Sequence, residues 1–220
     1  MYSLKLHALC PVLAALPIAA SLAAGATVSG RVLGTDGQGI AQAVVFVQSP
    51  SDAETKVSGA TATATMDQIN KTFVPGVLPI VVGTQVRFPN RDQIRHHVYS
   101  FSRTKTFELP LYKGEGAPPV LFDKVGVVKV GCNIHDWMSA IILVLPTPHF
   151  AMTDADGRFK LTGLPPGPYT LAAWHAQSEE KVENTEQRVQ VVGTDLEITF
   201  HLTLAPAKPR PALRGTRWDQ

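Results

Sequence analysis

Four side chains that bind soft metal ions lie in two segments of this 220-residue sequence. Cys132, His135 and Met138 follow one another at three-residue spacing, which puts a thiolate, an imidazole and a thioether in one short loop. Upstream, the adjacent His96 and His97 offer a further imidazole. Two histidines and one cysteine in a plane, with a weak axial methionine, are the ligands that proteins use for copper in electron transfer. The pattern therefore indicates a site for one copper ion.

One cysteine remains once the predicted export signal is removed. Residues 1–26 combine Lys5 with an apolar run from Ala8 to Ala24, and Ala24-Gly25-Ala26 is a small-x-small pattern typical of signal-peptide cleavage. Cleavage there removes Cys10 and leaves Cys132 without a disulfide partner. We therefore expect a periplasmic protein whose single thiol is buried or bound to metal. No later segment is long and apolar enough to span a membrane.

The composition and the patterning favour an all-β globular protein. Hydrophobic residues make up 45% of the chain and charged residues 17%, and the formal net charge of +2 gives no reason to expect nucleic acid as a partner. Short apolar runs recur between Gly, Pro, Asn and Asp, with no helical period after the signal. The predicted strands are 28–33, 43–47, 77–82, 85–88, 97–101, 125–130, 140–145, 169–174, 188–192 and 196–204.

The strands on either side of the Cys132 loop must position its ligands. The loop lies between the predicted strands 125–130 and 140–145, and a tight loop there can turn all three side chains toward one point. The two candidate histidines, His96 and His97, lie at the start of the predicted strand 97–101. Strand alternation puts His97 on the larger apolar face with Tyr99 and Phe101, which on its own favours His97 over His96 as the ligand.

The central segment, about residues 66–148, resembles the cupredoxin family. The stretch Gly-Thr-Gln-Val-Arg-Phe-Pro-Asn-Arg-Asp at 83–92 is similar to the strand and loop that deliver the first histidine. The spacing of the Cys132 loop is more similar to that of amicyanin-like members than to that of plastocyanin-like members. The combination of segments also resembles the methylamine utilization protein group. The resemblance implies a type 1 (blue) copper protein. It also implies that the protein is not an enzyme but carries single electrons between a dehydrogenase or other redox enzyme and a cytochrome-type acceptor.

The resemblance also bears on the choice between the two adjacent histidines. Cupredoxins commonly read His-Asn-Val here, so that aligning Val98 with that valine makes His96 the ligand and puts His97 beside the site, in place of the asparagine. We give this motif more weight than alternation, because the first ligand sits at a strand end, where pleating is often irregular. The expected ligands are His96, Cys132, His135 and Met138.

The flanking segments resemble a carboxypeptidase-regulatory-like, transthyretin-type β-sandwich. Val28 to Val47 reads as a hairpin with a turn at Asp36-Gly37, and Thr153-Asp-Ala-Asp-Gly-Arg-Phe precedes Leu-Pro-Pro-Gly-Pro-Tyr-Thr-Leu at 164–171. We expect residues 27–51 and 149–204 to form this sandwich, with the cupredoxin domain 52–148 inserted in or joined to it, and a flexible tail at 205–220. The flanks are also similar to carbohydrate-binding-like folds, so a module that binds carbohydrate weakly is one alternative function. Copper storage or delivery is the other.

Overall fold

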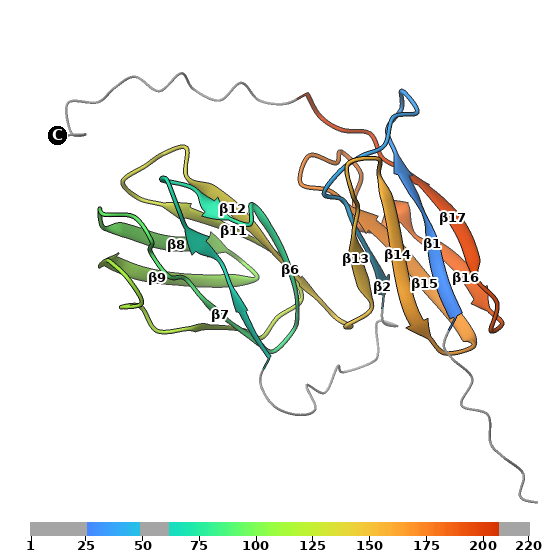
Figure 1. The fold of residues 1–220 in the computed structure, drawn as a ribbon, viewed down its shortest axis with the longest axis horizontal. Coiled ribbons are helices and arrows are strands. Elements are labelled where there is room, and N and C mark those ends of the chain that lie inside the picture. The colour runs from blue at the N-terminus through green and yellow to red at the C-terminus, as the bar shows by residue number, and fades with distance from the viewer. Residues whose placement is uncertain (1–25, 49–61, 207–220) are drawn as a thin grey trace, which may run out of the picture.

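The described part of the chain is built from β-strands. The computed structural model describes residues 26–48 and 62–206 (Figure 1). The helical structure within these residues is limited to one 3-10 turn, η1 (Val182–Thr185). The all-β class predicted from the sequence is therefore confirmed. In the same residues, no helix is both long and apolar enough to cross a membrane.

The strands from β3 to β12 pair with one another and form two facing sheets, which we call the central sandwich. One sheet has the order β6-β12-β11-β8-β9 and the other β10-β7-β3, and β4 and β5 pair separately. Val86 and Phe122 of the smaller sheet meet Val98, Val128 and Ile142 of the larger sheet in a shared core. The bounds are β3 (Thr63–Thr65), β4 (Asp67–Gln68), β5 (Phe73–Val74), β6 (Val77–Val81), β7 (Thr84–Arg87), β8 (His96–Ser102), β9 (Lys105–Tyr112), β10 (Val120–Phe122), β11 (Gly126–Cys132) and β12 (Ser139–Leu145).

The remaining strands form a second pair of sheets, the flanking sandwich, which Figure 1 shows beside the central one. Its sheets have the orders β14-β1-β17 and β13-β2-β15-β16. Val28, Phe159 and Phe200 of the first sheet pack against Val45 and Leu171 of the second. The bounds are β1 (Ala26–Leu33), β2 (Val44–Gln48), β13 (Phe150–Met152), β14 (Arg158–Leu164), β15 (Gly167–Trp174), β16 (Gln187–Val191) and β17 (Leu196–His201).

The predicted hairpin between β1 and β2 is wrong. A tight turn does form at the Asp36-Gly37 pair, where Gly34 N–H donates to Gln38 O and Leu33 bridges Gly39. The chain then crosses to the other sheet, so β1 pairs with β14 and β17, whereas β2 pairs with β13 and β15. A sandwich buries its core between two sheets, so each sheet needs apolar strands. The strand that follows Gly39, β2, adds its apolar residues to the second sheet and not to the sheet that contains β1.

Several predicted segments lie outside the described residues. These are nearly all of the signal (1–25), the boundary near 51 and most of the tail (207–220). Ala26, the last residue of the predicted signal, is buried at the start of β1. Ala205, the first residue of the predicted tail, donates its N–H to Gln177 O.

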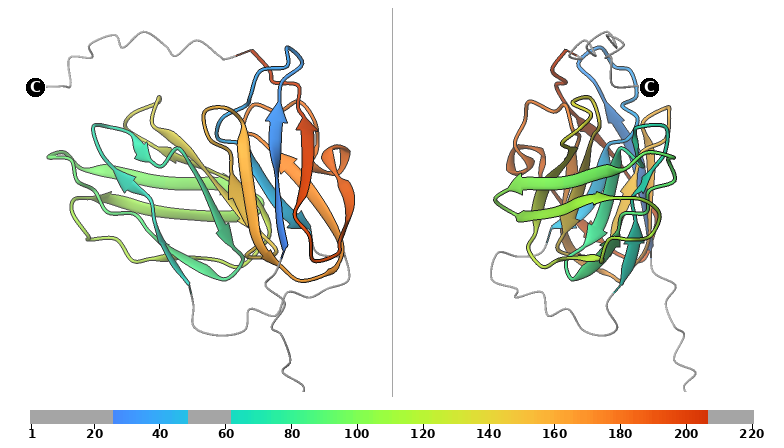
Figure 2. Two further views of the ribbon diagram at one scale, coloured as in Figure 1. Left: turned by 45° about the vertical axis from the view of Figure 1, so that its right-hand side comes forward. Right: turned by 90° about the vertical axis from the view of Figure 1, so that its left-hand side faces the viewer.

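The two sandwiches pack against each other through an apolar interface. Figure 2 shows their ribbons in two turned views. Phe46 and Trp174 of the flanking sandwich meet Val77, Leu143 and Leu145 of the central sandwich. Strand β12 serves both cores, because alternate residues of a strand point to opposite faces of its sheet. Its residues Ile142 and Val144 enter the central core, and Leu143 and Leu145 enter the interface.

Truncation at this interface should destabilise the protein strongly. Leu145 is 1% exposed, so Leu145→Ala should lower the free energy of unfolding by about 2–5 kcal/mol, through lost burial and the cavity left behind. Leu111 is 52% exposed, and Leu111→Ala should change the free energy of unfolding by no more than about 0.5 kcal/mol. Chemical denaturation of both variants measures the difference, and equal losses would contradict the interface.

Candidate metal centre

The loop that carries three of the predicted ligands is short and closed by its own backbone. Cys132 is the last residue of β11, and β12 begins directly after Met138. Within the loop, Met138 N–H donates to His135 O over 2.9 Å, and Cys132 N–H donates to Met138 O over 3.1 Å. These bonds hold Cys132 and His135 on one side of a single tight turn. The placement between these two strands agrees with the sequence prediction.

The remaining histidine arrives from the neighbouring strand. His96 is the first residue of β8, and β8 pairs with β11 through Val98 opposite Cys132 and Tyr99 opposite Gly131. The pairing places the start of β8 beside the end of β11. His96, like Val98, faces the interior and is fully buried, whereas His97 faces outward at an irregularity of the β8–β9 pairing.

The structure brings His96, Cys132 and His135 together in a buried cluster. Cys132 Sγ lies 3.8 Å from His96 Nδ1 and 3.7 Å from His135 Nδ1. One donor atom from each of the three residues lies within 4.8 Å of the other two. His96 is 0%, Cys132 3% and His135 7% exposed, so the three donors are shielded from water.

These distances fit a metal ion held by all three donors. Metal–sulfur bonds of about 2.3 Å and metal–nitrogen bonds of about 2.05 Å separate sulfur from nitrogen by about 3.8 Å at a trigonal angle and about 3.6 Å at a tetrahedral angle. The observed 3.8 and 3.7 Å fall in the range from the tetrahedral to the trigonal value. One thiolate and two imidazoles are a donor set that suits copper.

A carboxylate fixes which ring nitrogen of His96 carries a proton. Asp92 Oδ2 lies 2.8 Å from His96 Nε2, on the edge of the ring opposite to Nδ1. An ionised carboxylate only accepts, so Nε2–H donates to it and the lone pair of Nδ1 is left pointing at the cluster. Asp92 was not among the residues singled out in the sequence. Its position four residues before His96, in the same loop, was the available signal.

Asp92 is itself held by a distant part of the chain. The backbone N–H groups of Asn70 and Lys71 donate to its two carboxylate oxygens over 2.6 and 2.8 Å. Its own N–H donates to Asn90 Oδ1. Burial raises the pKa of Asp92, but the hydrogen bonds from Lys71, His96 and Asn70 outweigh burial and hold this pKa below its ordinary value. The carboxylate therefore stays charged and remains an acceptor for His96.

The cluster also shifts the pKa values of its own members. Burial raises the pKa of the Cys132 thiol, but hydrogen bonds from His96 and from the backbone N–H groups of His97 and Ile134 lower it below its ordinary value. Burial lowers the pKa of His96, and the hydrogen bonds to Cys132 and Asp92 more than offset it, so that this pKa is raised. When no metal is bound, a proton on His96 Nδ1 can be shared with the Cys132 thiolate. A metal ion that binds takes the place of this proton, and the Nδ1 lone pair then faces the ion.

Met138 lies at the end of the same loop and in the same core. It is 2% exposed and belongs to the apolar cluster that includes Cys132, Val98 and Val130. Methionine sulfur binds soft ions, so this buried thioether in the same loop is a candidate weak ligand. His135 and Trp137 lie at the other edge of the cluster, with ring centroids 5.2 Å apart.

His97 lies beside the cluster but its imidazole points away from it. Its Nε2 lies 2.9 Å from Glu108 Oε1 on β9, at a partly exposed position. His97 meets the metal-binding loop through its main chain, where Asn133 N–H donates to His97 O over 3.2 Å. The sequence placed this residue next to the ligands, and the structure places its main chain there.

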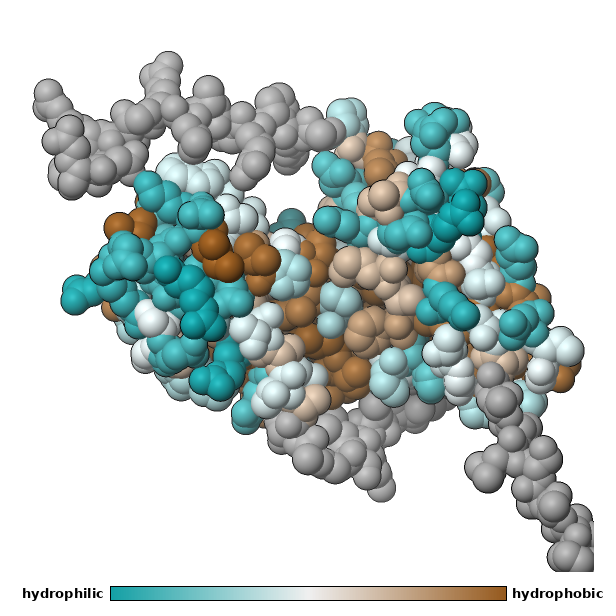
Figure 3. All heavy atoms as spheres, in the orientation of Figure 1, coloured by the Kyte–Doolittle hydropathy of each residue, from teal (hydrophilic) through white to brown (hydrophobic). Residues whose placement is uncertain are grey.

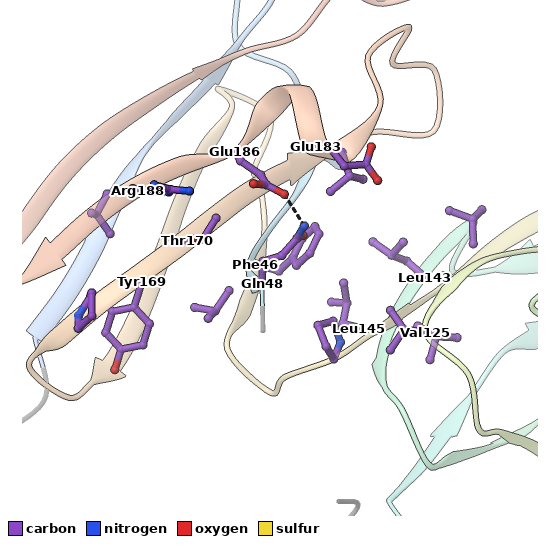
Figure 4. A pocket seen from close by; sticks show the side chains of 18 of the residues that line it. Phe46, Gln48, Val125, Leu143, Leu145, Tyr169, Thr170, Glu183, Glu186 and Arg188 are labelled. Carbon is purple, nitrogen blue, oxygen red and sulfur yellow. Dashed lines mark hydrogen bonds between the residues drawn. The ribbon is translucent and has the colours of Figure 1, made fainter. Parts of the chain in front are cut away.

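A groove between the two sandwiches is separate from the cluster and shares no lining residue with it. It encloses about 1320 Å³, and its walls are apolar toward the interface, as the hydropathy view shows (Figure 3). Leu145 and Val125 line one side, and Tyr169 and Arg188 line the other (Figure 4). Gln48 donates to Glu186 across the far wall. Trp174 is buried in the interface between the two sandwiches.

Comparison with known proteins gives likenesses to solved structures. No family model and no curated protein matches the chain. A purple cupredoxin from Nitrosopumilus maritimus is 26% identical over 38% of this chain and 98% of its own, with a TM-score of 0.33. A reduced mutant of amicyanin is 21% identical over 46% and 97%, with a TM-score of 0.35. A copper-containing nitrite reductase from Thermus scotoductus SA-01 is 26% identical over 45% of this chain and 25% of its own, with a TM-score of 0.35.

The two adjacent histidines should differ in their effect on metal binding. His96→Ala removes a donor nitrogen from the cluster and should abolish tight binding of Co(II), a spectroscopic probe for thiolate sites. His97→Ala removes an outward-facing ring and leaves the backbone N–H in place, so it should retain that binding. A titration followed by sulfur-to-cobalt absorption compares them. Loss of binding in His97→Ala alone would contradict the geometry.

The carboxylate behind His96 should strengthen metal binding without touching the metal. Asp92→Ala leaves Nε2–H without its acceptor and should weaken copper affinity by about 10–100-fold, the usual cost of losing such a partner. Asp92→Asn keeps an acceptor oxygen and should lose less. Competition with a copper(I) chelator measures both. An affinity that is unchanged in Asp92→Ala would show that the carboxylate does not position the ring.

Proposed function

We propose that this chain is a type 1 copper protein that carries single electrons. One copper ion is bound by His96, Cys132 and His135, with Met138 as the weak axial ligand. The observation that supports this most directly is the position of the Cys132 thiol between two imidazole Nδ1 atoms, at 3.7 and 3.8 Å, inside the core of the central sandwich. A copper ion in such a site supplies one-electron chemistry by alternating between its Cu(I) and Cu(II) states.

The protein's own residues suit electron transfer because they hold the donors still. Asp92 keeps the proton of His96 on Nε2, and the loop hydrogen bonds fix Cys132 and His135 relative to each other. Burial excludes water from the donors, so the ligands need not rearrange when the charge at the site changes. Rigid, water-excluding surroundings lower the cost of each electron transfer.

The edge of the site nearest the surface is at His135. This ring is the most exposed of the three clustered ligands, and it packs against Trp137. Ile134, the residue before it, is 48% exposed. Asn133 and Asp136 are also exposed beside it. A partly apolar contact area of this kind suits a brief encounter with a redox protein, such as a dehydrogenase or a cytochrome-type acceptor. The export signal predicted in residues 1–26 is the basis for proposing that this exchange takes place in the periplasm.

The same geometry bears on the alternatives. With three clustered donors and Met138 the four positions are filled, which leaves no place for a substrate and disfavours an enzyme. Copper storage or delivery needs an exchangeable ion, whereas donors that are 0–7% exposed should release it slowly. For the carbohydrate-binding alternative, the burial of Trp174 removes one of the stacking surfaces that such a module would use.

An absorption spectrum of the copper-loaded protein tests the proposal. A thiolate bound to Cu(II) in a trigonal site should give an intense band at roughly 600 nm. Cys132→Ser should abolish that band and leave the β-sheet circular dichroism unchanged, because serine replaces one buried atom. As a matched control, Ser100→Ala changes a buried polar residue on the same face of β8 as His96 and should keep the colour.

The possible outcomes separate the functions. A band that persists in Cys132→Ser means that another residue supplies the sulfur and ends the assignment. A colourless protein that binds oligosaccharide without copper favours the carbohydrate alternative. Fast loss of the ion to a mild chelator favours storage or delivery.

A further inference from the structure

The groove between the two sandwiches is a large, partly apolar surface that the described residues leave open. Its volume of about 1320 Å³ exceeds the roughly 300–1,000 Å³ of a usual small-molecule pocket. Val125 is 45% exposed on the wall that belongs to the central sandwich, and Tyr169 lies on the wall that belongs to the flanking sandwich. Open apolar surfaces are typical of binding sites. The size of this one suits a segment of polypeptide better than a small molecule.

The charged residues of the groove indicate the charge of its occupant. Among the lining residues, only Glu183, Glu186 and Arg188 are charged, and all three are exposed. Figure 4 shows the two glutamates on the same wall, on the flanking sandwich. Two carboxylates against one guanidinium favour an occupant that carries positive charge. The groove therefore suits a segment that is both apolar and cationic.

The described part of the chain ends at Pro206, close to the wall that carries these glutamates. Just before this end, Leu204 bridges Ser178. Four residues after Ser178 the chain reaches Val182, the first residue of η1 and part of the groove wall. The 14 residues 207–220, at about 3.4 Å each, can span about 48 Å, whereas β16 beside the groove has five residues and a length of about 17 Å. This segment is therefore long enough to run along the groove from η1.

The sequence of residues 207–220 matches the chemistry of the groove. The segment contains four cationic residues and one acidic residue, together with the apolar Leu213 and Trp218. The cationic residues are Lys208, Arg210, Arg214 and Arg217. Proline-containing segments lose little entropy when they bind along a groove with aromatic walls, and this segment contains Pro209 and Pro211.

We propose that residues 207–220 bind in the groove between the two sandwiches of their own molecule. Leu213 and Trp218 contact its apolar walls, and the cationic side chains lie beside Glu183 and Glu186. Covalent attachment gives the segment an effective concentration of about millimolar at the groove, so modest contacts suffice. Because the two walls belong to different sandwiches, the bound segment bridges them and opposes their separation. The clustered metal-binding residues do not line the groove, so the proposal is independent of the copper centre.

Photo-crosslinking in the full-length chain tests the placement. The photoreactive amino acid p-benzoylphenylalanine replaces Trp218 in one variant and Leu213 in another. Irradiation should produce crosslinks within one molecule, to peptides that contain the lining residues 125–127, 143–146 or 188–190, as mass spectrometry of the digest identifies. If neither variant yields a crosslink to the groove, or if groove crosslinks occur only in crosslinked dimers, the proposal is overturned.

A matched pair of substitutions tests the apolar wall. Val125 and Leu121 are 45% and 41% exposed, but only Val125 lines the groove. Val125→Ser should lower the yield of groove crosslinks by about threefold or more, because the bound segment loses an apolar contact. Leu121→Ser should leave the yield unchanged. Equal yields in the two variants would contradict binding against this wall.

Charge reversal tests the pairing with the glutamates. At low ionic strength, Glu183→Lys combined with Glu186→Lys should lower the crosslink yield by about fivefold or more, because the new cations repel the cationic segment. The control combines Glu108→Lys with Glu197→Lys, which changes the net charge equally at two exposed residues that do not line the groove. It should retain the yield. An equal reduction in both double variants would overturn the assignment of the cationic segment to this wall.

Discussion

The burial of one thiol between two imidazoles is the constraint that shapes the central sandwich. Polar and ionisable groups in an apolar core are costly unless they have partners. Cys132, His96 and His135 are one another's partners, at 3.7 and 3.8 Å from the sulfur. The ladder pairs between β8 and β11 join Val98 to Cys132 and Tyr99 to Gly131, where His96 approaches Cys132. The pairing of these two strands is thus tied to the assembly of the donor set.

The support for the cluster extends well beyond its members. Asn70 and Lys71 both adopt left-handed backbone conformations, with φ of 53° and 57°, and these aim two successive N–H groups at the carboxylate of Asp92. Asn90 completes the arrangement by donating to Ile94 O and Tyr112 O, which fixes the loop before His96. A segment far from the ligands in sequence therefore sets the orientation of one of them.

The sequence predicted the elements of this protein better than the way they pair. Each predicted strand overlaps an observed one, because alternating and apolar runs are local signals. β9 was missed because Pro110 interrupts its pattern, although it is an edge strand, where proline is tolerated. The residues of β8 do alternate between two faces, as predicted. The assumption that its more apolar face is the buried one was wrong. The aromatic face points outward, and His96 and Ser100 point inward, because the cluster and a hydrogen bond to Lys105 O satisfy them. The hydrogen bonds from Asn70 and Lys71 that hold Asp92 are long-range contacts that no local pattern reveals.

The two sandwiches are joined by covalent connections of very different length. Between Leu145 of β12 and Phe150 of β13 lie only residues 146–149, whereas residues 49–61 lie between the described segments on the other side. A short connection restricts the positions that two bodies can take. A chimaera that exchanges the central sandwich for another module must therefore keep the 146–149 crossing and the face beside it.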